Sequence, residues 1–163
     1  MIARRLGRSA VIAVLTVAGA AAAGAASASA ASASAQAAGP TQATLTYDAT
    51  YDDANASLAN VACSDGDNGL MTKGYTTLSS LPSFPNVAGV PAVTGWNSPS
   101  CGTAWQITDP ATGNSIDVVA VDSSASDFTV SQAAMNALTN GQGAANDTLN
   151  VTVQQVDPST VGL

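Results

Sequence analysis

Closely spaced turn-forming residues are the feature that most limits what this chain can fold into. Residues 71–92 carry five of them, namely Gly74, Pro82, Pro85, Gly89 and Pro91. Proline and glycine interrupt both helices and long strands, so this region is predicted to consist of short pieces joined by turns. A further turn, DPATGN at 109–114, separates two segments of β-forming residues. Short strands with many turns favour a small β-rich barrel.

Four segments have the composition of strands. Residues 44–48 and 149–154 alternate apolar and polar side chains, as a half-buried strand does. Residues 104–108 and 116–121 flank the turn and are predicted to form a hairpin. The second of these is apolar on both faces except at Asp117, which is typical of a strand buried in a closed or double-layered sheet.

Two short helices are expected beside the strands. Asp52 or Asp53 is a suitable N-cap for a helix that runs to about Asn60. Ser131 is a suitable N-cap for a helix over residues 132–139, which carries alanine and leucine along one stripe. The chain is thus predicted to be mainly β with short helices.

The N-terminal part of the chain has the layout of an export signal. Three arginines lie within the first eight residues, an apolar run follows over residues 11–23, and several Ala-x-Ala sites come next. We predict a signal peptide over residues 1–30, with cleavage somewhere in 28–38. The apolar run is too short and too rich in alanine and glycine to favour a membrane anchor. We therefore expect a secreted, extracellular or cell-wall protein without a membrane span.

Charge is distributed very unevenly along the chain. Residues 31–43 are mostly small and uncharged, and we predict that they form a disordered Ala/Ser-rich segment before a domain at 44–163. Beyond the predicted signal peptide one lysine, Lys73, faces eleven aspartates, which gives a net charge of −10. Without a basic patch, binding to nucleic acid is not expected.

The chain contains no histidine, and all eleven of its acidic residues are aspartates. A Ser-His-Asp triad, a Cys-His pair and histidine-ligated zinc are therefore excluded. Only aspartate remains for general acid–base chemistry. We predict no catalytic residues, and we expect neither a cofactor nor a metal site.

Two cysteines, Cys63 and Cys101, are predicted to form one disulfide, because a secreted chain passes through an oxidising compartment. A reactive thiol is the weaker interpretation. The bridge would join the CSDGDNG turn at 63–69 to the stretch WNSPSCGTAW, which holds both tryptophans. Trp105 is expected in the core. For Trp96 we favour core or partial burial over stacking on a sugar.

Several motifs in a fixed order resemble one protein family. They are TYD at 46–48, YDD at 51–53, CSDGDNGL at 63–70, KGY at 73–75, LPSFP at 81–85, WNSPSCGT at 96–103 and AMNALTNGQ at 134–142. Together they resemble the cerato-platanin family over about residues 44–163. The resemblance implies a six-stranded double-psi β-barrel like that of expansins and barwin. It also implies a secreted protein that binds chitin and N-acetylglucosamine oligomers, weakens cellulose without clear hydrolysis and acts as an elicitor or virulence factor on plants.

The sequence departs from the family pattern at one pair of positions. Family members usually read CGTCW where this chain has Ala104, and they usually end near CGL where this chain has Val161. Both halves of one family disulfide are therefore replaced together by apolar residues. We predict a C-terminus that is less firmly tied than in the family.

Asp122 is the strongest candidate for a sugar-binding residue. It follows the apolar strand in VAVD, which resembles the family's AID-type position in the polysaccharide groove. Its alternative role, given equal weight, is a strand-end aspartate that accepts backbone N–H bonds. Asp48, in the loop after the first strand, is a second candidate. Tyr47 and Tyr75 can offer apolar faces to pyranose rings or can equally be buried.

Three further candidates lie near the predicted disulfide. Asp65, Asn68 and Asn97 can hydrogen-bond sugar hydroxyls, but their favoured role is to shape the loops as Asx turns. No calcium site is predicted in DGDNG, because the run is too short for an EF-hand loop.

Three functions remain open from the sequence. The leading one is a non-hydrolytic cell-wall protein that binds polysaccharide such as chitin, N-acetylglucosamine oligomers or cellulose, with a host receptor as a possible further partner. A glycosidase is the second, and it would need two carboxylates, for example Asp122 with a loop aspartate. A surface-active, film-forming structural protein is the third.

Overall fold

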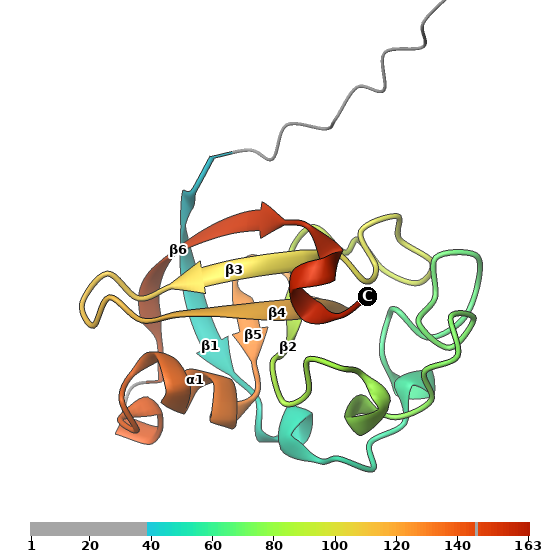
Figure 1. The fold of residues 1–163 in the computed structure, drawn as a ribbon, viewed down its shortest axis with the longest axis horizontal. Helices are drawn as coiled ribbons and strands as arrows, with labels where there is room; N and C mark the ends of the chain where they lie inside the picture. Colours follow the sequence, from blue (N-terminus) through green and yellow to red (C-terminus); the bar gives the residue numbers. More distant parts are fainter. Residues whose placement is uncertain (1–38, 146) are drawn as a thin grey trace, which may run out of the picture. The chain divides into compact units, whose positions relative to one another are not determined.

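The computed structural model describes residues 39–145 and 147–163, and the predicted signal peptide and residues 31–38 lie outside this part of the chain. Its strands are β1 (Thr41–Tyr47), β2 (Val87–Val90), β3 (Ala104–Thr108), β4 (Ser115–Ser123), β5 (Phe128–Val130) and β6 (Leu149–Val156). They close into a barrel in the order β1-β5-β2-β4-β3-β6 (Figure 1). The expected six-stranded β-barrel is thereby confirmed.

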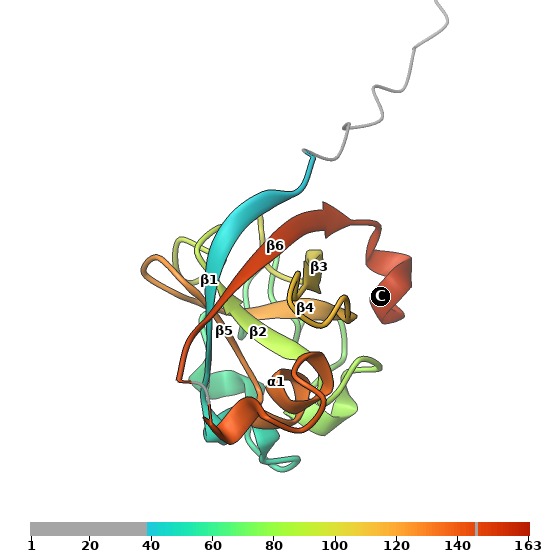
Figure 2. The same cartoon turned by 90° about the vertical axis from the view of Figure 1, so that its left-hand side faces the viewer.

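The barrel mixes parallel and antiparallel pairs. β1 pairs with β5, and β2 with β4, in parallel, while the other four neighbouring pairs are antiparallel. Figure 2, a view turned by 90°, shows how the strands wind around the barrel. Parallel neighbours cannot be joined by a tight hairpin and need long connections. The connections before and after β2 gather on one side of the barrel, opposite the tip of the β3–β4 hairpin (Figure 1).

The predicted hairpin is confirmed. β3 has the expected bounds, and β4 extends the expected segment at both ends. Asp109 closes the turn: its carboxylate is buried and accepts hydrogen bonds from Ala111 N at 2.9 Å and from Thr112 Oγ1 at 3.1 Å. The turn therefore fixes the register in which β3 and β4 pair.

β4 lies at the centre of the core. Four of its nine residues, Val118, Val119, Ala120 and Val121, are fully buried, which accounts for their apolar character on both faces. Leucines from the connections, among them Leu58, Leu70 and Leu78, are also buried in the same cluster. The connection between β1 and β2 thus contributes buried side chains to the core.

The helical segments are short. α1 (Gln132–Leu138) begins where the sequence predicts, and the Ser131 hydroxyl accepts a hydrogen bond from Ala134 N at 3.0 Å as its N-cap. The remaining helical pieces are single 3-10 turns, η1 (Ala49–Asp52), η2 (Leu58–Asn60), η3 (Leu78–Ser80), η4 (Gly143–Ala145) and η5 (Pro158–Val161).

The helix expected from Asp52 or Asp53 to Asn60 is wrong, because η1 ends at Asp52, a turn follows it, and the single 3-10 turn η2 lies at the far end of the expected range. Local hydrogen bonds compete with the helix there: Asp53 Oδ1 accepts from Asn55 N at 2.9 Å. Asp52 does cap a helix, but a distant one. Its carboxylate accepts from the N–H groups of Gln132 at 2.7 Å and Ala133 at 2.9 Å, at the start of α1.

Both ends of the barrel domain differ slightly from expectation. β1 begins at Thr41, three residues before the predicted strand. At the other end η5 is followed by Gly162 in the left-handed conformation. Val161 and Ala104, which stand where the family pattern has cysteines, are both buried. Within residues 39–145 and 147–163, no helix is long and apolar enough to cross a membrane.

Candidate functional site

A pocket of about 250 Å³ opens between the segment that follows β1 and the end of β4. Two carboxylates and several hydroxyl and amide groups face it beside three apolar side chains. It is lined by Asp48, Thr50, Tyr51, Ala56, Ser57, Asn60, Val61, Leu78 and Asp122. These residues come from three 3-10 turns, from the loop residues beside those turns and from one strand, so the fold assembles them from distant parts of the chain.

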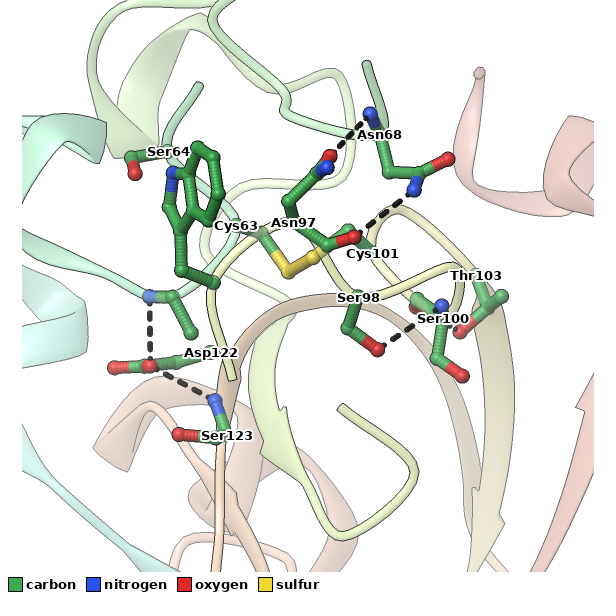
Figure 3. The surroundings of a disulfide bond; sticks show 12 residues. Cys63, Ser64, Asn68, Asn97, Ser98, Ser100, Cys101, Thr103, Asp122 and Ser123 are labelled. Carbon is green, nitrogen blue, oxygen red and sulfur yellow. Dashed lines mark hydrogen bonds between the residues drawn. A yellow bond between two sulfur atoms is a disulfide. The ribbon is translucent and has the colours of Figure 1, made fainter. Parts of the chain in front are cut away.

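Asp122, the strongest sequence candidate, lies in this pocket at the end of β4. Its Oδ1 accepts hydrogen bonds from Ala62 N at 2.9 Å and Ser123 N at 2.8 Å (Figure 3). Its Oδ2 accepts a longer bond, 3.3 Å, from the hydroxyl of Tyr51. The two roles considered for Asp122 are thus combined, since the carboxylate both binds backbone N–H groups and faces the pocket.

Tyr51 is a pocket residue that sequence reasoning missed. Its hydroxyl reaches Asp122 because Gly89 on β2 has no side chain: a Cβ at that position would lie 3.1 Å from the Tyr51 oxygen. Burial raises the pKa of Tyr51 well above its usual range, and the charge and hydrogen bond of Asp122 raise it further. Tyr51 therefore stays protonated and acts as a hydrogen-bond donor at neutral pH.

Asp48, a second predicted residue, shares the pocket with Asp122. It is the N-cap of η1, and its Oδ1 accepts from Thr50 N at 2.8 Å and Thr50 Oγ1 at 2.7 Å. The cap holds this exposed carboxylate at the pocket's edge. The structure thus brings together two of the seven residues predicted to bind sugar.

The predicted disulfide between Cys63 and Cys101 is confirmed, and Figure 3 shows Asp122 among the residues that surround it. Backbone hydrogen bonds tie both half-cystine segments to β4. Cys63 N donates to Val121 O at 3.1 Å, and Gly102 N donates to Ala120 O at 2.9 Å. The bridge itself does not line the pocket, but it cross-links two segments that are hydrogen-bonded to β4, the strand that carries Asp122.

Asn68 and Asn97 pair with each other beside the disulfide. Asn97 Oδ1 accepts from Asn68 N, and Asn97 O accepts from Asn68 Nδ2, both at 2.9 Å (Figure 3). Asn97 has a positive φ of 57°. Gly66 lies so close that a Cβ there would be 2.7 Å from Asn97 Oδ1. The favoured interpretation of these two asparagines, as residues that shape the loops, agrees with this geometry.

The expected burial of Trp96 is wrong, because its side chain is 65% exposed. Its indole N–H donates to Asp65 Oδ1 at 2.6 Å, and this bond holds the pKa of Asp65 below its usual value. Trp105 packs partly buried against the core, with its ring 5.3 Å from that of Phe128 in an edge-to-face contact.

The two remaining candidates, Tyr47 and Tyr75, are half-buried and pack against the core, and neither lines the pocket. A second, more open hollow of about 490 Å³ was not predicted. It is lined by Pro82, Ser83, Asn86, Asp117, Ser159, Thr160, Val161 and Gly162. It sits at the opposite end of β4 from Asp122 and combines polar loop residues with the C-terminal turn.

The closed six-stranded barrel with one helix is the fold class expected from the sequence, a small barrel of the expansin-like type. Residues 43–163 match the family described as Cerato-platanin. The chain belongs to the cerato-platanin family.

Named relatives agree with this assignment. Cerato-platanin of Ceratocystis fimbriata f. sp. platani is 47% identical over 116 residues, which are 71% of this chain and 84% of that protein. The Allergen Asp f 15 homolog of Arthroderma benhamiae is 46% identical over 119 residues. These cover 73% of this chain but only 58% of that relative, so the chain spans less than two thirds of its length.

Solved structures give the same result. Cerato-platanin 3 from M. perniciosa has a TM-score of 0.73 and 50% identity, with 76% of this chain and 100% of that chain covered. The solution structure of the fungal elicitor Cerato-Platanin has a TM-score of 0.65 and 44% identity, with 72% of this chain and 95% of that chain covered. A Clavibacter michiganensis expansin mutant in complex with cellohexaose shares the fold alone, at a TM-score of 0.50 and 18% identity, with 72% and 50% covered.

Proposed function

We propose that this protein is a secreted, non-hydrolytic cell-wall protein that binds polysaccharides of the chitin and β-glucan type through the pocket at Asp122. The observation that carries the proposal is the shared lining of that pocket by Asp48, Tyr51 and Asp122. Carboxylate oxygens accept hydrogen bonds from sugar hydroxyls, and the pocket also offers the hydroxyl of Ser57 and the amide of Asn60. Family membership supports the same class of ligand.

The charge of the domain favours a neutral glycan. Residues 39–163 contain one lysine and eleven aspartates, and two of these carboxylates face the pocket. A polymer with its own carboxylates or phosphates would be repelled. The expansin complex with cellohexaose shares only the fold with this chain, so cello-oligomers serve as one set of probes beside N-acetylglucosamine oligomers.

The test is binding of both oligomer series by isothermal titration calorimetry. Asp122→Asn removes the charge with little change in shape, and we expect affinity to fall at least about tenfold, since hydrogen bonds to charged groups contribute roughly 1.5–3 kcal/mol. Asp147→Asn is the matched control: it removes the same charge from an exposed residue outside the pocket. Equal affinity of the wild type and Asp122→Asn would remove Asp122 from the binding site.

A glycosidase is the second candidate, and it is favoured by the placement of two carboxylates, Asp48 and Asp122, in one pocket. Glycoside hydrolysis requires such a pair on either side of the cleaved bond. Sustained release of reducing ends from chitin or cellulose, abolished in Asp122→Asn and retained in Asp147→Asn, would establish hydrolysis. Binding without such release supports the non-hydrolytic function.

Action on a host, as an elicitor or virulence factor, is a further part of the proposal. It is supported by the similarity of this chain to the solution structure of the fungal elicitor Cerato-Platanin. The measurement is the defence response of plant tissue to the purified protein. A heat-treated, disulfide-reduced sample is the control. An equal response to the native and the treated sample would show that elicitation does not require the folded protein.

A further inference from the structure

Trp96 is exposed in a way that the fold does not require. Among the described residues, Trp96 is the one large apolar side chain that is exposed, with 65% of its surface accessible. A mobile tryptophan at the surface would be ordinary, but this one is held in place. Its indole N–H donates a 2.6 Å hydrogen bond to Asp65 Oδ1, and Ser64 Oγ lies 3.4 Å from the same oxygen.

The two loops that carry this pair are rigidly joined. Cys63 and Cys101 cross-link them, and the two hydrogen bonds between Asn68 and Asn97 add a second link. Gly66 approaches Asn97 so closely that no side chain fits at residue 66. Pre-organisation of this kind lowers the entropy lost when a ligand binds. The ring of Trp96 is thus presented as a fixed flat surface.

The chain that leads to Asp65 starts at the pocket. Val61 lines the pocket, Ala62 N binds the Asp122 carboxylate, and Cys63 N binds Val121 O. Asp65 is four residues beyond Val61, so the two are separated by at most about 14 Å even for a fully extended chain. A short oligosaccharide is long enough to contact the pocket and the Trp96 ring at once.

We propose that Trp96 and Asp65 form an outer sugar subsite, which holds one ring of a neutral oligosaccharide whose neighbouring units reach the pocket at Asp122. This inference rests on the proposed polysaccharide binding. The indole face stacks on the C–H face of a pyranose, since an aromatic ring combines apolar area with a polar edge. Asp65 orients the ring through Oδ1, and its Oδ2 accepts a hydrogen bond from a sugar hydroxyl.

The subsite explains two features together. An apolar face beside a carboxylate matches a sugar ring, which is apolar on its faces and carries hydroxyls at its edge. The carboxylate at this position also disfavours polyanionic glycans, as do those in the pocket. The ligand class is therefore a neutral β-linked polymer, recognised over several units and not as a single sugar.

The experiment compares ligand length. Affinities of two-sugar and six-sugar oligomers, from both the N-acetylglucosamine and the cellulose series, are measured by calorimetry for the wild type and Trp96→Ala. We expect the wild type to bind the long oligomers more tightly than the short ones. Trp96→Ala should lose about tenfold in affinity for the long oligomers, which corresponds to about 1.4 kcal/mol. Its affinity for the short ones should stay unchanged.

Matched variants separate stacking from structure. Trp96→Phe keeps an aromatic face and should retain most of the length effect, whereas Trp96→Leu keeps apolar area but not the flat ring and should lose it. An intact fold in each variant is checked by its thermal midpoint. Wild-type affinities that do not depend on length, or a Trp96→Ala variant that binds every length as the wild type does, would overturn the subsite.

Failure of the subsite and failure of the proposed function give different results. Absence of binding to every oligomer by the wild type overturns both the polysaccharide proposal and the subsite. Binding that is lost in Asp122→Asn but unchanged in Trp96→Ala overturns the subsite alone. Reduced adsorption of Trp96→Ala to an air–water interface, with unchanged oligomer affinity, also overturns it and assigns Trp96 to surface activity.

Discussion

The backbone N–H of Ala62 donates a 2.9 Å hydrogen bond to Oδ1 of Asp122. Ala62 directly precedes Cys63, whose own N–H binds Val121 O on β4. The carboxylate of the pocket and the disulfide are therefore parts of one unit, built from β4 and the turn at residues 62–63 that is hydrogen-bonded to it. Support for the pocket comes from the cross-link as well as from the barrel.

Removal of the disulfide should weaken both stability and binding. The bridge spans 38 residues, for which the chain-entropy estimate gives about 4 kcal/mol. We expect Cys63→Ala/Cys101→Ala to lower the free energy of unfolding in urea by about 2–5 kcal/mol and to weaken oligomer binding. A double variant that unfolds at the same urea concentration as the wild type would show that the hydrogen bonds to β4 suffice.

Gly89→Ala should displace Tyr51 from Asp122. The added Cβ would lie 3.1 Å from the Tyr51 oxygen and 3.3 Å from Ser123 O, so at least one neighbour must move. We expect a loss of about 1–3 kcal/mol in unfolding free energy and weaker sugar binding. Gly39→Ala is the control, since nothing lies within 4 Å of its Cβ position. Equal stabilities of the two variants would contradict the close contact.

The strands and helix with strong patterns could be predicted from the sequence. β3 and β4 were expected because β-forming segments flank a recognisable turn, and α1 because Ser131 precedes an apolar stripe. β2 and β5 were not, since they have four and three residues and β2 contains Gly89 at a register shift. Segments this short carry no measurable periodicity, and they form strands only because neighbouring strands pair with them.

The candidate site could be predicted only in part. Asp122 was found because it ends the buried strand, and Asp48 because it follows the first strand. Tyr51 was missed because its contact with Asp122 joins residues 71 positions apart, and no local pattern records such a pair. The exposure of Trp96 could not be predicted from the sequence either, because it depends on how two loops meet at a disulfide.

Alkaline pH should destabilise the protein through Tyr51. Burial, and then the nearby Asp122 carboxylate, raise the pKa of Tyr51 above its ordinary value of 10.0. The folded state therefore holds the phenol proton more tightly than the unfolded chain. This contribution is fully present below about pH 10 and is lost as the pH rises above it. The unfolding free energy of the wild type should fall more steeply above pH 10 than that of Tyr51→Phe. If the unfolding free energies of the two proteins fall in parallel with pH, Tyr51 is not the group responsible.

Acid should release Trp96 from Asp65. The hydrogen bond from Trp96, more than any other cause, lowers the pKa of Asp65 below its ordinary value of 3.8. The bond is therefore present above that value and is lost as the pH falls through the lowered pKa. We expect a change in tryptophan fluorescence with its midpoint below pH 3.8. Asp65→Asn should lack this transition, and its persistence there would assign the signal to Trp105 or another group.

The C-terminus should exchange its amide hydrogens faster than the barrel core. The N–H groups of Thr160, Gly162 and Leu163 bond only within the final turn, to Asp157 O, Ser159 O and Pro158 O. Those of Val119 and Ala120 bond to other segments of the core, to Asn86 O and Thr103 O. Such local turns open without unfolding the rest of the protein. Equal protection of Leu163 and Ala120 in a hydrogen-exchange experiment would show that burial of Val161 replaces the missing bridge.

A cross-link at the two substituted family positions should reverse this difference. Val161 and Ala104 are both buried, and η5 packs against β3. If the variant Ala104→Cys/Val161→Cys forms a disulfide, we expect the C-terminal amides to become protected and the unfolding free energy to rise by about 2–4 kcal/mol. The single variant Val161→Cys is the control for the loss of the valine side chain. A double variant with a quantitative bridge but unchanged exchange at Leu163 would show that the missing disulfide is not what loosens this end of the chain.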